Sequence, residues 1–255
     1  MLIANLLTII GIVAEATFVA VLVWRRTYRS FPVFFSYIVW GLAGDSTILT
    51  LQIVTQSQSL APFEIETYID SLFQYLVLIE LAWSILRPMQ RSLPKGFLPG
   101  ISLLIAATAV LAWPLSQIKE TPGLAWQFLF ALHTQRTFAI LRVLFFLALV
   151  CSSQFLRISW RDREFQVATG LGFYSLVSLA GTIVHSHQFF GLQYLYVDVA
   201  VGCSYLLALG YWIYSFVQQE APRREMTPEM QDLLLGMADA LRRQRDRLSQ
   251  TTISS

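Results

Sequence analysis

Residues 2–24 read LIANLLTIIGIVAEATFVAVLVW, an apolar stretch in which Glu15 is the one charged side chain. An α-helix of about 20 apolar residues crosses the hydrocarbon core of a bilayer, so this stretch predicts a transmembrane helix. Arg25 and Arg26 follow it directly and no cation precedes it, which is unlike a cleaved secretory signal. The stretch therefore predicts a membrane span.

Six further stretches of similar length and composition follow along the chain. Hydrophobic residues make up 55% of the sequence and charged residues 13%, a balance that excludes a soluble domain built on one core. We predict an all-α, polytopic membrane protein with seven transmembrane helices over residues 1–218 and a cytoplasmic tail over residues 219–255. The predicted spans are Leu2–Trp24, Val33–Thr55, Glu64–Leu86, Phe97–Leu115, Gln127–Leu156, Val167–Phe189 and Leu192–Val217.

Cations are concentrated in the loops after the first, third and fifth spans and in the tail, whereas the other loops hold only Lys119. Because positively charged loops stay in the cytoplasm, the amino terminus is predicted outside and the carboxyl terminus inside. We expect a multi-pass protein of a bacterial-type inner (plasma) membrane, with the lipid bilayer as its main partner and no nucleic acid.

The first three and the last three spans resemble two imperfect copies of one pattern. Tyr37, Leu42-Ala43-Gly44 and Asp70 in the first copy correspond to Tyr174, Leu179-Ala180-Gly181 and Asp198 in the second; the two copies also share Tyr75 with Tyr205 and Trp83 with Trp212. This pattern predicts three spans repeated around one extra span, with a site between the copies. The alternative explanation is that the ends of spans share a similar composition.

Ionisable groups inside spans are costly and usually face the interior of a bundle, so they mark the candidate site. Asp45, Asp70, Arg142 and Asp198 are predicted in the middle or outer half, where they would bind a small ligand or ion. Gln74 and Gly202 lie one turn from Asp70 and Asp198 on the same faces. Glu15 and Glu80 would extend a proton path inward. The alternative is a structural salt bridge of Arg142 with Asp45 or Asp198.

Two families resemble parts of this pattern. Tyr68-Ile69-Asp70 with Glu80-Leu81-Ala82, and Val197-Asp198-Val199, resemble the third and seventh helices of microbial rhodopsins. The resemblance implies a seven-helix scaffold, but Gly202 occupies the position of the retinal-binding lysine, so no covalent retinal cofactor is expected. The three-plus-one-plus-three plan also resembles PQ-loop carriers, although the Pro-Gln motif is missing. His185 and His187 diverge on a helix and do not form a zinc site.

The tail carries a helix signal of its own. Thr227 and Pro228 suit the start of a helix, which we predict over residues 228–249. Met230, Leu234, Met237 and Leu241 fall on one face and would bind a partner, either a second copy in a homodimer or a cytoplasmic protein.

These features favour a membrane sensor or receptor-like module that binds a small ligand or a proton in a polar cavity in the outer half of the bundle. The alternative is a small-solute or proton-coupled transporter. An intramembrane enzyme is a third reading that we do not favour, since no catalytic motif appears.

Overall fold

The computed structural model describes residues 2–55, 60–85, 97–116, 126–156, 162–187 and 192–218, together with Gly236. Among these residues all regular structure is helical, and seven helices are long and apolar enough to cross a membrane. The chain therefore has the architecture of a multi-pass membrane protein. The helices are α1 (Leu2–Trp24), α2 (Pro32–Thr55), α3 (Leu60–Ile85), α4 (Phe97–Ala112), α5 (Trp126–Leu156), α6 (Arg163–His187) and α7 (Leu192–Val217), with short 3₁₀ turns η1 (Thr27–Arg29) and η3 (Trp113–Ser116).

The helix boundaries follow local chemistry. Pro32 begins α2, where its missing N–H is not needed. Pro114 lies in η3 directly after α4, consistent with the inability of proline to continue a helix. Two helices begin four residues earlier than predicted: α3 begins at Leu60 rather than at Glu64, and α6 begins at Arg163 rather than at Val167. Arg163 and Glu164 were excluded from the predicted span for their charge, but both are buried and bonded.

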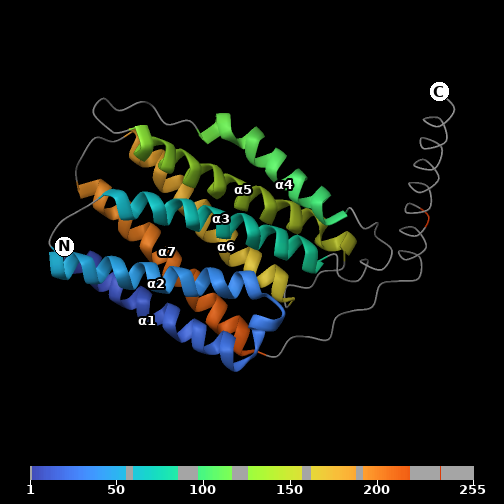
Figure 1. Ribbon diagram of the computed structural model, residues 1–255, viewed down its shortest axis with the longest axis horizontal. Coiled ribbons are helices and arrows are strands. Elements are labelled where there is room, and N and C mark those ends of the chain that lie inside the picture. The colour runs from blue at the N-terminus through green and yellow to red at the C-terminus, as the bar shows by residue number, and fades with distance from the viewer. Residues whose placement is uncertain are drawn as a thin grey trace.

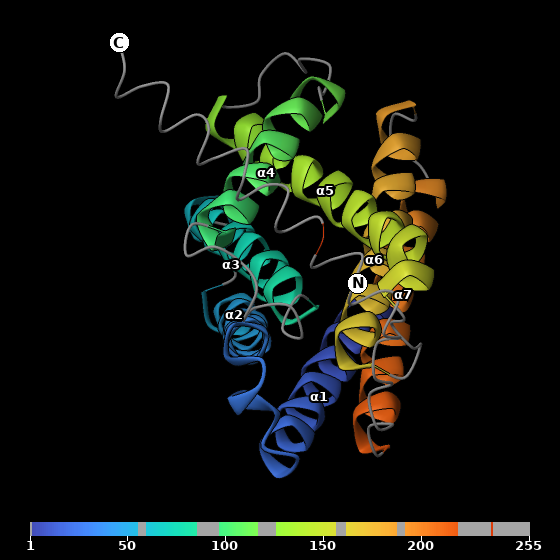
Figure 2. The same ribbon diagram turned by 90° about the vertical axis from the view of Figure 1, so that its right-hand side faces the viewer.

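Six helices form a closed ring and the seventh lies outside it (Figures 1 and 2). Around the ring, α1 packs on α2, α2 on α3, α3 on α5, α5 on α6, α6 on α7, and α7 returns to α1. Helix α4 contacts only α3 and α5 among the helices, besides η3 at its own end. Exchanging α1, α2 and α3 with α5, α6 and α7 maps each neighbouring pair of this ring onto another neighbouring pair.

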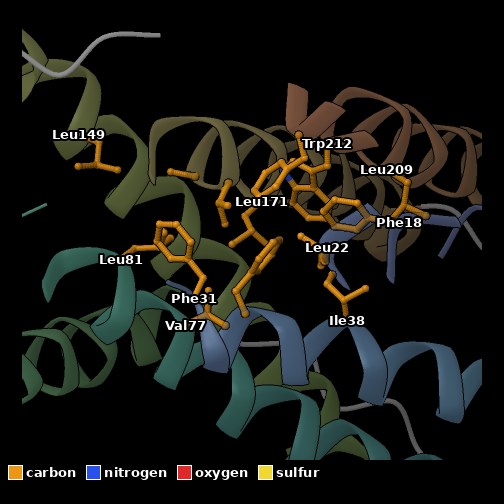
Figure 3. Packing of buried hydrophobic residues seen from close by; sticks show 14 of the residues in the cluster. Phe18, Leu22, Phe31, Ile38, Val77, Leu81, Leu149, Leu171, Leu209 and Trp212 are labelled. Carbon is orange, nitrogen blue, oxygen red and sulfur yellow. The ribbon is translucent and has the colours of Figure 1, made fainter. Parts of the chain in front are cut away.

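We call the end where α1, α3, α5 and α7 finish the base of the bundle. The apolar core fills the half of the ring that is nearer to the base, and all six ring helices contribute to it (Figure 3). The ring of Phe18 stacks on Trp212 at 5.6 Å between centroids and makes T-shaped, edge-to-face contacts with Phe34 and Phe216. The members are Phe18, Leu22, Phe31, Phe34, Ile38, Val77, Leu81, Ile85, Leu149, Val167, Ala168, Leu171, Leu209, Trp212 and Phe216.

Two glycines let α6 approach its neighbours within the core. A Cβ atom on Gly170 would lie 2.2 Å from Nε1 of Trp212 on α7, and one on Gly172 would lie 2.6 Å from the ring of Phe146 on α5. Small residues permit such close approach between membrane helices. The indole N–H of Trp212 donates to the carbonyl of Gln166 at 3.1 Å, which fixes the ring against α6.

Charged side chains at the base bind the carboxyl end of α7. The guanidinium of Arg163 donates to the carbonyl oxygens of Ser215 and Gln218, both at 2.7 Å, and Arg25 donates to the carbonyl of Val217. These carbonyls have no partner within the helix, so arginine donors satisfy them and complement the helix dipole.

Candidate functional site

Directly beyond the apolar core, each of the six ring helices contributes a polar side chain at a similar depth. Glu15 precedes the core residue Phe18 by three positions on α1, and Gln74 precedes Val77 by three on α3. Tyr174 follows Leu171 by three on α6. We call this set the polar layer. It consists of Glu15, Tyr37, Asp45, Asp70, Gln74, Arg142, Tyr174 and Tyr205.

Asp70 connects three helices within the polar layer. Nε2 of Gln74, one turn along α3, donates a hydrogen bond to its carboxylate. Tyr37 on α2 and Arg142 on α5 are close enough to interact electrostatically with Asp70. The predicted shared face of Asp70 and Gln74 is therefore confirmed, and Asp70 and Arg142 lie in one cluster.

Arg142 is buried at mid-helix with only 4% of its surface exposed. Its guanidinium carbon lies 5.7 Å from the centroid of the Tyr174 ring, an arrangement that favours a cation–π attraction. Nε and Nη1 have no hydrogen-bond partner among the described residues. A buried donor without a partner costs about 1–3 kcal/mol, and more when it is charged. Arg142 therefore presents two donors to any acceptor that enters the layer.

Glu15 on α1 joins the polar layer through a hydrogen bond from Tyr205 on α7. It is 1% exposed, and the hydroxyl of Tyr205 donates to its Oε1, while Oε2 has no partner among the described residues. The rings of Tyr174 and Tyr205 lie 5.3 Å apart between centroids. Gly41 leaves room beside the carboxylate, because a Cβ there would lie 3.7 Å from Oε1. The layer thus holds a buried acceptor, Oε2 of Glu15, and two buried donors on Arg142. A chain of contacts through Tyr205 and Tyr174 links the two side chains.

Asp45 and Asp198 occupy different positions relative to this cluster. Asp45 is half-buried, one turn beyond Gly41 on α2, and interacts electrostatically with Glu15 and Asp70. Asp198 is exposed on α7, about two turns nearer to the start of that helix than Tyr205. Asp198 is therefore not a member of the polar layer. Gly202 faces α1, where a Cβ would meet Leu7 at an ordinary contact distance of 3.7 Å.

Glu80 lies at the base and has a different environment from Glu15. Its two carboxylate oxygens accept the backbone N–H groups of Val33 and Phe34 at 2.9 and 2.8 Å, so it caps the start of α2. On α3 it lies between the fully buried core residues Val77 and Leu81. Glu80 is thus held by backbone groups beside apolar core residues, whereas Glu15 lies in the polar layer.

Three tyrosines complete the layer, and the search for charged groups alone misses them. Tyr37 and Tyr174 are paired by the sequence repeat, and Tyr205 is paired there with Tyr75. The predicted repeat thus pairs Tyr37 with Tyr174, a signal in the sequence that points to two of these tyrosines. The predicted partner face of Met230, Leu234, Met237 and Leu241 lies outside the described residues.

Comparison of the chain with family models, with curated proteins and with solved structures finds no match. The resemblances to microbial rhodopsins and to PQ-loop carriers thus gain no support from these comparisons. Functional conclusions rest on the geometry of the polar layer.

Proposed function

We propose that this protein is a membrane sensor or receptor-like module that binds a small ligand carrying a carboxylate at Arg142 in the polar layer. The observation that carries the proposal is the pair of buried N–H donors, Nε and Nη1 of Arg142, without a partner. An N–H of a charged guanidinium binds a carboxylate oxygen through a charge-assisted hydrogen bond, and such bonds are strong in a low-dielectric site.

The apolar core between the polar layer and the base favours a sensor over a transporter. The apolar core spans all six ring helices on the side of the base, and Glu80 is engaged as a helix cap. A carrier would need a polar route through this half in another conformation. A sensor needs only a shift in helix packing that reaches the base, where Arg25 and Arg163 hold the end of α7.

Orientation and output belong to the same proposal. The arginine-rich loops favour a cytoplasmic base and a site that opens outward, in a bacterial-type inner membrane. The internal repeat, with α4 as the linking span, is consistent with the exchange of neighbours around the ring. The tail that follows α7 would carry the signal to a second copy or to a cytoplasmic partner.

The test uses the full chain in lipid nanodiscs and measures the melting temperature with sodium salts of acetate, propionate, glutamate and γ-aminobutyrate. At least one compound is expected to raise the melting temperature in a saturable manner. Arg142→Gln should abolish the shift in melting temperature. Arg142→Lys, which keeps the charge but lacks the planar guanidinium group, should weaken binding about tenfold. The matched control is Arg29→Gln at an exposed position.

Two results would count against this proposal. A shift that survives Arg142→Gln would show that the ligand binds elsewhere. Accumulation of the same compound by proteoliposomes, abolished by Arg142→Gln, would favour the transporter instead.

A further inference from the structure

We infer that the ligand is a small zwitterion, whose carboxylate binds Arg142 and whose ammonium group binds on the side of Glu15. This inference rests on the proposed function and adds a second binding group to the same site. It concerns the chemical class of the ligand and leaves the choice between sensor and transporter unchanged.

The first support is the charge composition of the polar layer. Glu15, Asp45 and Asp70 are acidic, whereas Arg142 is the one basic side chain in the layer. Asp70 is the carboxylate that Arg142 attracts. Buried charges are tolerated when they are paired, so the remaining acidic groups favour a ligand that brings a positive charge. A simple anion would satisfy Arg142 but would leave Oε2 of Glu15 without a donor.

The second support is the free oxygen of Glu15. Tyr205 uses Oε1, and Oε2 is a buried acceptor without a partner among the described residues. An ammonium N–H is the donor that such an oxygen binds most strongly. Gly41 faces the same carboxylate without a side chain, which leaves space on the α2 side.

The third support is the aromatic surround. Trp40 and Phe73 have ring centroids 6.2 Å apart, and Tyr37 lies 6.5 Å from Phe73. Tyr174 and Tyr205 face the layer from α6 and α7. Aromatic faces attract ammonium groups, and carboxylates beside such rings strengthen the attraction. A chain of contacts through Tyr174 and Tyr205 links Arg142 with Glu15, so a ligand that binds both must carry its two charges at opposite ends.

The experiment compares probes that differ in charge, using the full chain in nanodiscs and isothermal titration. The probes are propionate, tetramethylammonium, glycine betaine, β-alanine and γ-aminobutyrate. At least one zwitterion should bind about tenfold or more tightly than propionate, the gain expected for one charge-assisted contact. Glu15→Gln should remove this preference and leave the binding of propionate unchanged. Arg29→Gln, at an exposed position near the base, is the control and should keep the preference.

The outcomes separate this inference from the proposed function. Equal binding of propionate and of every zwitterion, dependent on Arg142, would overturn the inference and leave the proposed function standing. Binding of tetramethylammonium without propionate would overturn both. Glu15→Leu, which removes the carboxylate and keeps an apolar side chain at this buried position, serves as a second variant if Glu15→Gln does not fold. An undiminished preference for the zwitterion in that variant would also overturn the inference.

Discussion

Charged side chains at the base and in the polar layer have opposite surroundings. At the base, Glu80 and Arg163 bind backbone groups at the ends of α2 and α7. In the layer, Arg142 and Glu15 retain polar atoms without partners among the described residues. The difference follows from helix geometry, because unpaired backbone groups occur only at helix ends. A charge at mid-helix must therefore find a side chain or a ligand.

The largest expected effect tests the packing of the base. Gly170→Ala would place a methyl group against the Trp212 indole and should lower the free energy of unfolding by about 3 kcal/mol. Gly210→Ala is the matched control, because nothing lies within 4 Å of its Cβ position. Thermal unfolding in nanodiscs measures both variants. Equal stability of the two would mean that α6 and α7 pack less closely than described.

A second test makes the same substitution in each region. Glu80→Gln removes one of two bonds to the start of α2 and should cost about 2 kcal/mol of stability. Glu15→Gln keeps an acceptor for Tyr205 and removes a buried acidic group, so it should leave stability unchanged or raise it. Thermal unfolding of both variants in nanodiscs measures whether each substitution lowers or raises stability. A loss of stability of similar size in both variants would contradict the proposed difference between charged groups at the base and in the layer.

The smallest expected effect compares the two tyrosines that the repeat pairs. Tyr75 donates to the carbonyl of Ser102 on α4 at 2.9 Å, outside the layer, whereas Tyr205 donates to Glu15 within it. Tyr75→Phe should lower stability by about 0.6 kcal/mol, typical of a hydrogen bond between membrane helices. It should not change the shift in melting temperature that a bound probe causes. If Tyr75→Phe abolished that shift, the site would extend to α4.

The seven spans could be predicted from the sequence because length and hydropathy determine them directly. Leu2–Trp24 and Leu192–Val217 have the predicted bounds. The start of α6 could not be predicted, since Arg163 and Glu164 are polar by composition but are buried through contacts with α7 and α3. Such contacts depend on which helices are neighbours, and hydropathy contains no information about that.

The site was predicted in part for a similar reason. Helical spacing correctly paired Asp70 with Gln74, because both residues lie on one helix. Whether Asp198 belongs to the site depends on the rotation of α7 about its axis and on the depth of the polar layer along that helix. The exposed position of Asp198 and the buried hydroxyl of Tyr205 on the same helix illustrate how two turns change a residue's surroundings.

Helix α4, which lies outside the ring, determines how the two halves of the chain are oriented relative to each other across the bilayer (Figure 1). A single extra crossing returns the chain to the side from which it started, so α5 runs in the same direction as α1. Without that crossing, α5, α6 and α7 would enter the membrane upside down, and their arginine-rich ends would lie on the opposite face. One peripheral helix thus gives both halves of the ring the same polarity, and the arginines of both can gather at one surface.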